Sequence, residues 1–317
     1  MKYDQIATLA DALTENIARV IVGKEQETQL VLAALLAGGH ILLEDVPGTG
    51  KTTLAKSLAR SLSCSFARVQ FTPDLLPSDV TGMRIYSQQT GTFSFVKGPA
   101  FTHILLADEI NRATPRTQSA LLECMEERQI TEGGITYPLS SPFLVIATQN
   151  PVETQGTFPL PEAQLDRFLM QLSMGTPTPD EEIQIMKRFL VDAPLEKLDP
   201  VCTKDELIQM QEEYKNVFIH EELMNYIVKI VQATRQSAEI VSGVSPRGTL
   251  ALLKAVRAYA FVQGRDYVVP EDIKTLCGPV LAHRLVFPRG SQGRAAGLRM
   301  MEKILGQIPV PTENWGR

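Results

Sequence analysis

Short apolar segments separated by polar, helix-like stretches occupy the first half of the chain. Segments 40–46, 103–109 and 142–150 are nearly continuous apolar runs, which is typical of strands buried on both faces of a parallel sheet. Two further runs, 67–71 and 168–174, are also predicted as strands.

Helical periodicity lies between these predicted strands. Leu54, Leu58 and Leu62 recur at helical spacing. A second helix is predicted over 115–129, because Thr114 suits an N-cap and Pro115 the first helical position. Alternating strands and helices predict an α/β fold built on a parallel five-stranded sheet.

The pattern changes at 175–182, GTPTPDEE, whose glycine and prolines indicate a linker. Thr203 and Glu206 then form a capping box, and Ser245 precedes Pro246 at another helix start. Helices are predicted over 220–239, 245–264, roughly 270–285 and 294–306. The chain is therefore predicted to divide into an α/β domain, residues 1–175, and an all-α domain, residues 176–317.

The composition describes a globular protein with a full-sized core. The chain has 317 residues, of which 44% are hydrophobic and 21% charged, and its net charge is −5. This acidic balance makes nucleic acid an unlikely partner, because phosphate contacts need a basic surface. No apolar run reaches the ~18 residues that a membrane span requires. The N-terminus lacks a signal core and the four cysteines form no C-x-x-C, so we expect a cytoplasmic protein with free thiols.

One stretch, LLEDVPGTGKTTLAKSLA, resembles a phosphate-binding loop that leads into a helix. The usual pattern G-x-x-x-x-G-K-[ST] places glycine where this chain has Asp45. Gly48 and Gly50 still allow the backbone to approach phosphates, Lys51 suits the β- and γ-phosphates, and Thr52 suits Mg²⁺. The sequence predicts an ATP and Mg²⁺ site here and gives Asp45 no role.

Three polar residues end two other predicted strands. Asp108 and Glu109 close the apolar run HILLADE, and buried carboxylates are costly without partners such as Mg²⁺. Asp108 is predicted to hold the metal and Glu109 to orient or deprotonate a water molecule. Asn150 follows the next buried strand and could reach the γ-phosphate, although an asparagine before Pro151 also suits a plain turn.

Two arginines complete the candidate catalytic set. Arg167 precedes the fifth predicted strand, and Arg247 lies in the first turn of the helix that begins at Pro246. Arginine stabilises the charge of a transferring phosphoryl group. A cation near a helix N-terminus is unfavourable unless an anion compensates it, which favours a phosphate near Arg247 over a surface salt bridge.

Together these segments resemble the AAA+ ATPases, and specifically the MoxR family, over nearly the whole chain. The resemblance rests on segments 21–27, 42–59, 68–82, 105–129, 143–170 and 245–273. It implies an AAA+ P-loop α/β core followed by a C-terminal all-α lid domain. It also implies hairpin insertions near 85–98 and 129–139, where alternating residues flank Thr90-Gly91 and Gly133-Gly134.

The resemblance also implies roles position by position. Asp108 and Glu109 resemble the Walker B pair and Asn150 resembles sensor 1. Arg167 resembles an arginine finger offered to a neighbouring subunit, and Arg247 resembles sensor 2. The cofactor-binding residues implied are Ile21, Val22 and Gly23 at the adenine, then Pro47, Gly48, Thr49, Gly50, Lys51, Thr52, Thr53 and Asp108.

A family of this kind implies ATP hydrolysis that drives remodelling or maturation of client proteins, including metal-cofactor insertion. The expected assembly is a homo-oligomer, a hexameric ring, working with a partner that bears a von Willebrand factor A domain. Three alternatives remain open from the residues: a metal-chelatase ATPase subunit, a nucleic-acid or transcription-associated motor, and a scaffold that binds ATP and barely hydrolyses it.

Overall fold

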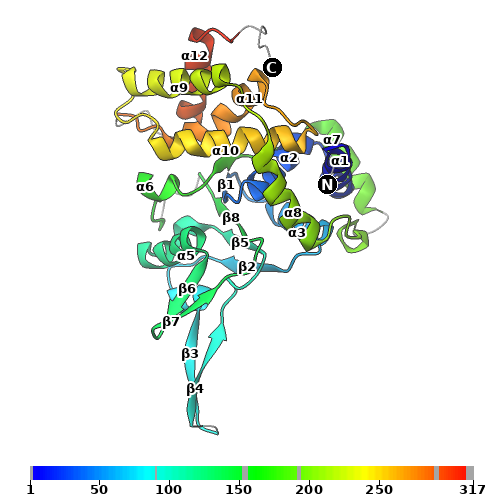
Figure 1. The fold of residues 1–317 in the computed structure, drawn as a ribbon. Helices are drawn as coiled ribbons and strands as arrows, with labels where there is room; N and C mark the ends of the chain where they lie inside the picture. The colour runs from blue at the N-terminus through cyan, green and yellow to red at the C-terminus, as the bar shows by residue number, and fades with distance from the viewer. Residues whose placement is uncertain (1–2, 90, 152–155, 191–193, 289–292, 312–317) are drawn as a thin grey trace.

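Residues 3–89, 91–151, 156–190, 194–288 and 293–311 are described by the computed structural model. Five parallel strands form the central sheet in the order β2-β5-β8-β1-β9 (Figure 1). The strands are β1 (Ile41–Glu44), β2 (Phe66–Gln70), β5 (Ile104–Asp108), β8 (Leu144–Gln149) and β9 (Met170–Leu172). Each falls within or overlaps a predicted apolar run, so the predicted parallel five-stranded sheet is confirmed.

Alternate residues of the strands pack into two separate cores. Ile41 and Leu43 of β1 belong to one hydrophobic cluster, whereas Leu42 belongs to the other. The first cluster includes α1 (Tyr3–Ala18), α2 (Glu25–Leu36) and α3 (Lys51–Ser61), and the second includes α5 (Pro115–Glu127). The strands are therefore buried on both faces, which explains their continuous apolar character.

Helices follow the sheet in the C-terminal half, as predicted. They are α7 (Pro179–Phe189), α8 (Lys204–Glu213), α9 (Glu221–Gln236), α10 (Pro246–Val262), α11 (Pro270–Leu281) and α12 (Arg294–Gln307). The hydroxyl of Thr203 accepts from the Glu206 N–H, and that of Ser245 from the Gly248 N–H, so the side chains expected to cap α8 and α10 do so. Short helical turns complete the chain: α4 (Pro77–Thr81), η1 (Ile110–Arg112), α6 (Glu162–Leu165), η2 (Pro194–Lys197), η3 (Tyr214–Asn216) and η4 (Ala282–Arg284).

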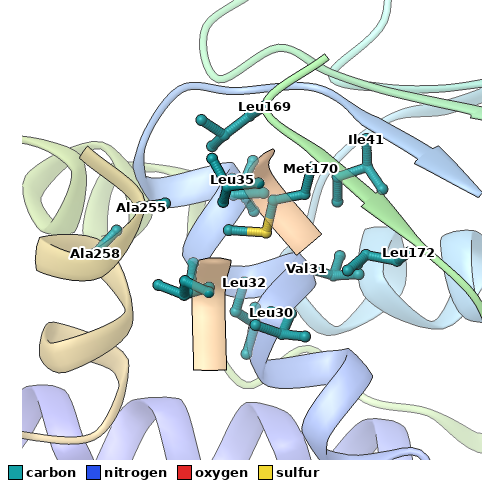
Figure 2. Packing of buried hydrophobic residues seen from close by; sticks show 14 of the residues in the cluster. Leu30, Val31, Leu32, Leu35, Ile41, Leu169, Met170, Leu172, Ala255 and Ala258 are labelled. Carbon is teal, nitrogen blue, oxygen red and sulfur yellow. The ribbon is translucent and has the colours of Figure 1, made fainter. Parts of the chain in front are cut away.

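The helical region is joined to the sheet by a continuous core. Helix α10 packs on α2, and α11 packs on β9. Figure 2 shows side chains of this core from α2, α10 and the neighbouring strands: Leu30, Val31, Leu32, Leu35, Ile41, Leu169, Met170, Leu172, Ala255 and Ala258. Residues from both sides of position 175 belong to that single cluster, so the position of the lid is fixed by apolar packing.

Two antiparallel hairpins interrupt the α/β pattern. Strands β3 (Gly82–Ser87) and β4 (Thr92–Lys97) project far from the body (Figure 1), and β6 (Gln129–Glu132) pairs with β7 (Ile135–Pro138). Thr90 lies outside the described residues. Within those residues no helix is long and apolar enough to cross a membrane, and all four cysteines are free.

Candidate nucleotide-binding site

A cavity of about 370 Å³ opens at the edge of the sheet where the strands end. It lies beyond the carboxyl ends of β1, β5 and β8, the usual place for a ligand in an open α/β sheet. The residues that line it are Pro47, Gly48, Gly50, Lys51, Thr52, Thr53, Arg68, Gln70, Asp108, Glu109, Thr148, Gln149 and Asn150. Most of the residues predicted around the phosphates therefore converge here.

The phosphate loop has the backbone that its glycines allow. Gly48 and Gly50 adopt φ values of 89° and 87°, in the left-handed region where other residues are strained. Helix α3 begins directly after Gly50, so its unpaired N–H groups and positive dipole end face the cavity. The Lys51 ammonium donates to the carbonyls of Asp45 and Val46, both at 2.9 Å.

The surroundings of Lys51 affect its charge and favour binding of an anion. Partial burial lowers the pKa of Lys51, while the carboxylates of Asp45, Asp108 and Glu109 act in the opposite direction. Nucleotide phosphates would add further negative charge beside the ammonium and favour its charged form. Within the loop, the Lys51 ammonium is held by backbone carbonyls, which a phosphate can replace as acceptors.

Asp45, which the sequence left unexplained, ties the start of the loop to the end of β9. Its carboxylate accepts hydrogen bonds from the Ser173 hydroxyl at 2.6 Å, the Met174 N–H at 2.6 Å and the Gly175 N–H at 3.2 Å. The side chain is only 6% exposed. A glycine at this position would provide none of these bonds, so Asp45 has a structural role between the phosphate loop and the segment that leads to the lid.

Asp108 and Glu109 are held in place by Thr148 at the end of β8. The Thr148 hydroxyl donates to Asp108 Oδ1 at 2.6 Å and accepts from the Glu109 N–H at 2.8 Å. Glu109 adopts φ 57° and ψ 50°, a left-handed conformation that is uncommon for glutamate and often found at functional sites. The two carboxylates therefore enter the cavity in fixed directions.

Sequence reasoning missed the polar side chains that surround this acidic pair. Arg68 forms an ion pair with Asp108 at 2.6 Å. Gln70 donates to Glu109 Oε2 at 2.7 Å, and Arg112 lies 3.0 Å from the same oxygen. The only signal in the sequence was the position of Gln70 near the end of a predicted strand; its register with Asp108 comes from the structure.

The remaining residues expected at the nucleotide lie beside the phosphate cavity or at its rim. Asn150 follows β8 directly, is 8% exposed and lines the cavity. Ile21 does not line it, but a Cβ placed on Gly50 would lie 3.9 Å from Ile21 Cδ1, so this side chain abuts the loop. Val22 and Gly23 continue from Ile21 toward α2, and Thr49 bonds within the loop to the Val46 carbonyl at 3.3 Å.

Arg167 and Arg247 do not join this cavity. Both bind the carboxylate of Glu126, at 3.2 Å each. They line a second cavity of about 310 Å³ that also contains Gly39 and Leu169, which precede β1 and β9. That cavity lies at the amino ends of β1 and β9, whereas the phosphate cavity lies at the carboxyl ends of the strands. The two cavities are thus separated by a strand length of roughly 13–20 Å. Arg247, near which the sequence predicts a phosphate, therefore does not face the phosphate loop of its own chain.

Comparisons with known proteins agree with the fold and the loop. Residues 40–170 match the model of the ATPase family associated with various cellular activities (AAA), and residues 232–303 match the AAA lid domain. YeaC of Bacillus subtilis (strain 168), named as an uncharacterized protein, is 49% identical over 99% of this chain and 98% of YeaC. Chaperone MoxR1 of Mycobacterium tuberculosis is 45% identical over 89% of this chain and 76% of MoxR1.

A solved structure shows the same arrangement. The crystal structure of a protein from Cytophaga hutchinsonii, provisionally described as an ATPase, has a TM-score of 0.89 and 39% identity to this chain. The similarity covers 98% of this chain and 97% of that one. Sheet, loop and lid thus define an AAA+ ATPase, an enzyme that hydrolyses ATP. Within that class, the chain belongs to the MoxR family.

Proposed function

We propose that ATP binds with its phosphates against the loop and that its hydrolysis drives remodelling or maturation of client proteins. The observation that carries the proposal is the convergence of Lys51, Thr52, Asp108 and Glu109 on one cavity. The N-terminus of α3 and the Lys51 ammonium both favour an anion there. The adenine would lie toward Ile21, Val22 and Gly23, the first of which abuts the phosphate loop.

The donor set at the loop fits a magnesium ion. The Thr52 hydroxyl and the Asp108 carboxylate both line the cavity, and Mg²⁺ prefers such oxygen ligands together with phosphates. Among the described residues, no group of three or more His, Cys, Asp or Glu side chains could hold a metal. Phosphate oxygens would complete the coordination, and the bound ion would neutralise charge on the transferring phosphoryl group.

Glu109 is the proposed residue that orients the attacking water and accepts its proton. Its carboxylate lines the cavity, and contacts with Gln70 and Arg112 hold it at the mouth. Asn150 is proposed to contact the γ-phosphate or that water, because it lies at the end of the adjacent strand. Thr148 links the Asp108 carboxylate to the backbone N–H of Glu109 and so supports the position of both residues at the cavity.

Arg167 and Arg247 are proposed to act on the nucleotide of a neighbouring copy. Both guanidinium groups lie at the sheet edge opposite to their own phosphate loop and share one carboxylate, Glu126. A second copy is needed to bring a phosphate to them, and head-to-tail contacts of this kind close into rings. We propose a hexameric ring in which each active site combines residues from two subunits.

A client is proposed to contact the projecting β3–β4 hairpin. Ile85 and Val96 lie on one face of this hairpin and Tyr86 and Phe93 on the other, and these side chains are 47%, 48%, 51% and 60% exposed. Tyr86 and Phe93 contact each other, and both faces leave apolar surface open to a client. A chaperone-like role agrees with the name of MoxR1. The proposal includes a cytoplasmic location, metal-cofactor insertion as one form of maturation, and a partner with a von Willebrand factor A domain.

The substitution Glu109→Gln tests the chemistry. ATP affinity should stay within about twofold, whereas kcat should fall by about 10²-fold or more, because proton acceptance is lost. Glu222→Gln, the same change at an exposed residue of α9, should leave kcat unchanged. Unchanged turnover in Glu109→Gln would remove Glu109 from this role.

The substitution Arg167→Ala tests the shared site. A single chain should still bind ATP, because Arg167 lies far from its own loop, whereas assembly-dependent hydrolysis should be lost. The measurement is ATPase rate against protein concentration, with nucleotide binding followed separately. Normal activity at high protein concentration would place the arginine finger elsewhere in the chain.

A further inference from the structure

Helix α7 presents its apolar side to solvent. None of its eleven residues, all within the described chain, is buried. Ile183 and Met186 of α7 and the next residue, Leu190, are 44%, 59% and 83% exposed. Their spacing of three and four residues places them on one helical face. An amphipathic helix normally buries such a face, so the orientation of α7 requires an explanation.

The opposite side of α7 is attached to the body through polar contacts. The Arg188 guanidinium donates to the Ala18 carbonyl. Glu181 packs closely against Gly23: a Cβ added to Gly23 would lie 1.7 Å from Glu181 Oε1. The helix is also well capped, since Thr178 and Glu181 exchange hydrogen bonds at its start. The outward direction of the apolar face is therefore built into the fold.

Helix α7 stands next to the proposed nucleotide. Gly23, which Glu181 contacts, lies two residues beyond Ile21, and Ile21 abuts Gly50 of the phosphate loop. The apolar face of α7 points away from Gly23, so a molecule that covers it would lie one helix width from the segment that leads to the phosphate loop. The proposed function already requires a second copy at this place, because Arg167 and Arg247 must come from a neighbour.

The surface around Arg247 offers a complement to α7. Leu250, one helical turn from Arg247, is 58% exposed, and Lys254 lines the same cavity. The first turn of α7 is acidic, with Asp180 and Glu182 exposed. The apolar face of α7 matches an exposed leucine on α10, and the acids in the first turn of α7 match Arg247 and Lys254. The two surfaces also carry the opposite signs, Lys187 and Arg188 at the end of α7 and Glu126 beside Arg247, so the charge match concerns the first turn of α7 only.

We infer that the face formed by Ile183, Met186 and Leu190 is a subunit interface, and that its occupant is the α10 surface around Leu250 of a second copy. The contact is head-to-tail, so each subunit uses α7 on one side and α10 on the other. This inference rests on the proposed exchange of arginines between subunits. It adds an apolar contact that would hold Arg167 and Arg247 of one subunit against the nucleotide site of the next.

The test combines two substitutions, Met186→Asp and Leu250→Asp, in chains that also carry Glu109→Gln so that ATP persists. The parent Glu109→Gln chain should assemble with ATP in sedimentation velocity experiments. Each aspartate variant alone should weaken self-association by about tenfold or more. Mixed in equal amounts, the two variants retain one intact α7 face and one intact α10 face, so they should form complexes of two chains and no ring.

Two controls separate assembly from folding. Met224→Asp makes the same change as Met186→Asp at a methionine of α9 that is 40% exposed, and it should assemble like the parent. Titration with a fluorescent ATP analogue should show single-chain affinities within about twofold of the Glu109→Gln parent for all variants, since none of the added substitutions lies in the phosphate cavity.

The outcomes distinguish this inference from the proposed function. A Met186→Asp chain that assembles like the parent would overturn the α7 interface and leave the shared active site intact. Two variants that fail to pair when mixed would show that the α7 and α10 faces do not meet. A parent chain that stays single at every ATP and protein concentration would overturn the proposed ring, and the interface with it.

Discussion

Replacing Asp45 should weaken both the fold and the phosphate loop. Its buried carboxylate accepts from Ser173, Met174 and Gly175, and alanine would remove all three bonds. The Met174 N–H is buried and would lose its acceptor, at a cost of about 1–3 kcal/mol. The Gly175 N–H and the Ser173 hydroxyl are more accessible, and removing a buried charge returns some desolvation energy. We expect Asp45→Ala to lower the free energy of unfolding by about 2–3 kcal/mol.

A graded series makes the reasoning testable. Asp45→Asn retains the volume and one acceptor oxygen, so we expect a loss of about 1 kcal/mol. Ser173→Ala leaves both backbone donors paired with Asp45 and should cost less than about 1 kcal/mol. Asp45→Ala keeps the backbone carbonyl that accepts from Lys51 but releases the start of the phosphate loop from the segment after β9, so ATP affinity should fall by about fivefold.

The assays are urea unfolding followed by far-ultraviolet circular dichroism, and titration with a fluorescent ATP analogue. The expected order of stability is wild type, Ser173→Ala, Asp45→Asn and then Asp45→Ala. An Asp45→Ala chain within about 0.5 kcal/mol of wild type would refute the structural role of the carboxylate. Equal losses for Asp45→Asn and Asp45→Ala would show that charge matters more than hydrogen bonding.

Three further predictions follow from the described contacts. Gln70→Ala removes a hydrogen bond to Glu109, so kcat should fall by about fivefold with KM unchanged; an equal loss of ATP affinity would contradict this. Glu126→Gln should change stability by less than about 1 kcal/mol and preserve assembly-dependent ATPase, because its ion pairs are partly exposed; loss of activity as in Arg167→Ala would contradict this. Burial lowers the pKa of His40 to about 3, so the unfolded chain binds more protons below pH 6.5 and stability should fall as pH decreases; His40 should account for about 2 kcal/mol at pH 5, and His40→Gln should flatten the urea-unfolding profile between pH 6.5 and 5.

The sequence predicted those parts of the site whose chemistry depends on local order along the chain. Lys51 and Thr52 start a helix after two glycines, and Asp108 and Glu109 end a buried strand. Such positions follow from strand and helix patterns, because the carboxyl ends of parallel strands meet at one edge of the sheet. The parallel sheet itself was readable from its continuous apolar runs.

The remaining features depend on contacts between distant segments. The pairing of Gln70 with Glu109 needs the register of β2 on β5, and the role of Asp45 needs the end of β9 beside β1. Helices α1 and α2 were not assigned from the pattern, yet packing of α10 on α2 sets where the lid lies. The location of Arg247 away from its own phosphate loop follows from that packing and could not be read from its helix alone.

The placement of the lid bears on how long a nucleotide stays bound. Among the described residues that line the phosphate cavity, none comes from beyond Asn150. The described part of a single chain therefore places no lid residue over the phosphates, and dissociation of ATP or ADP from it should be fast and governed by the contacts with the phosphate loop and the proposed adenine site. Slow release of ATP or ADP would then require the neighbouring subunit, which covers the site in the proposed ring.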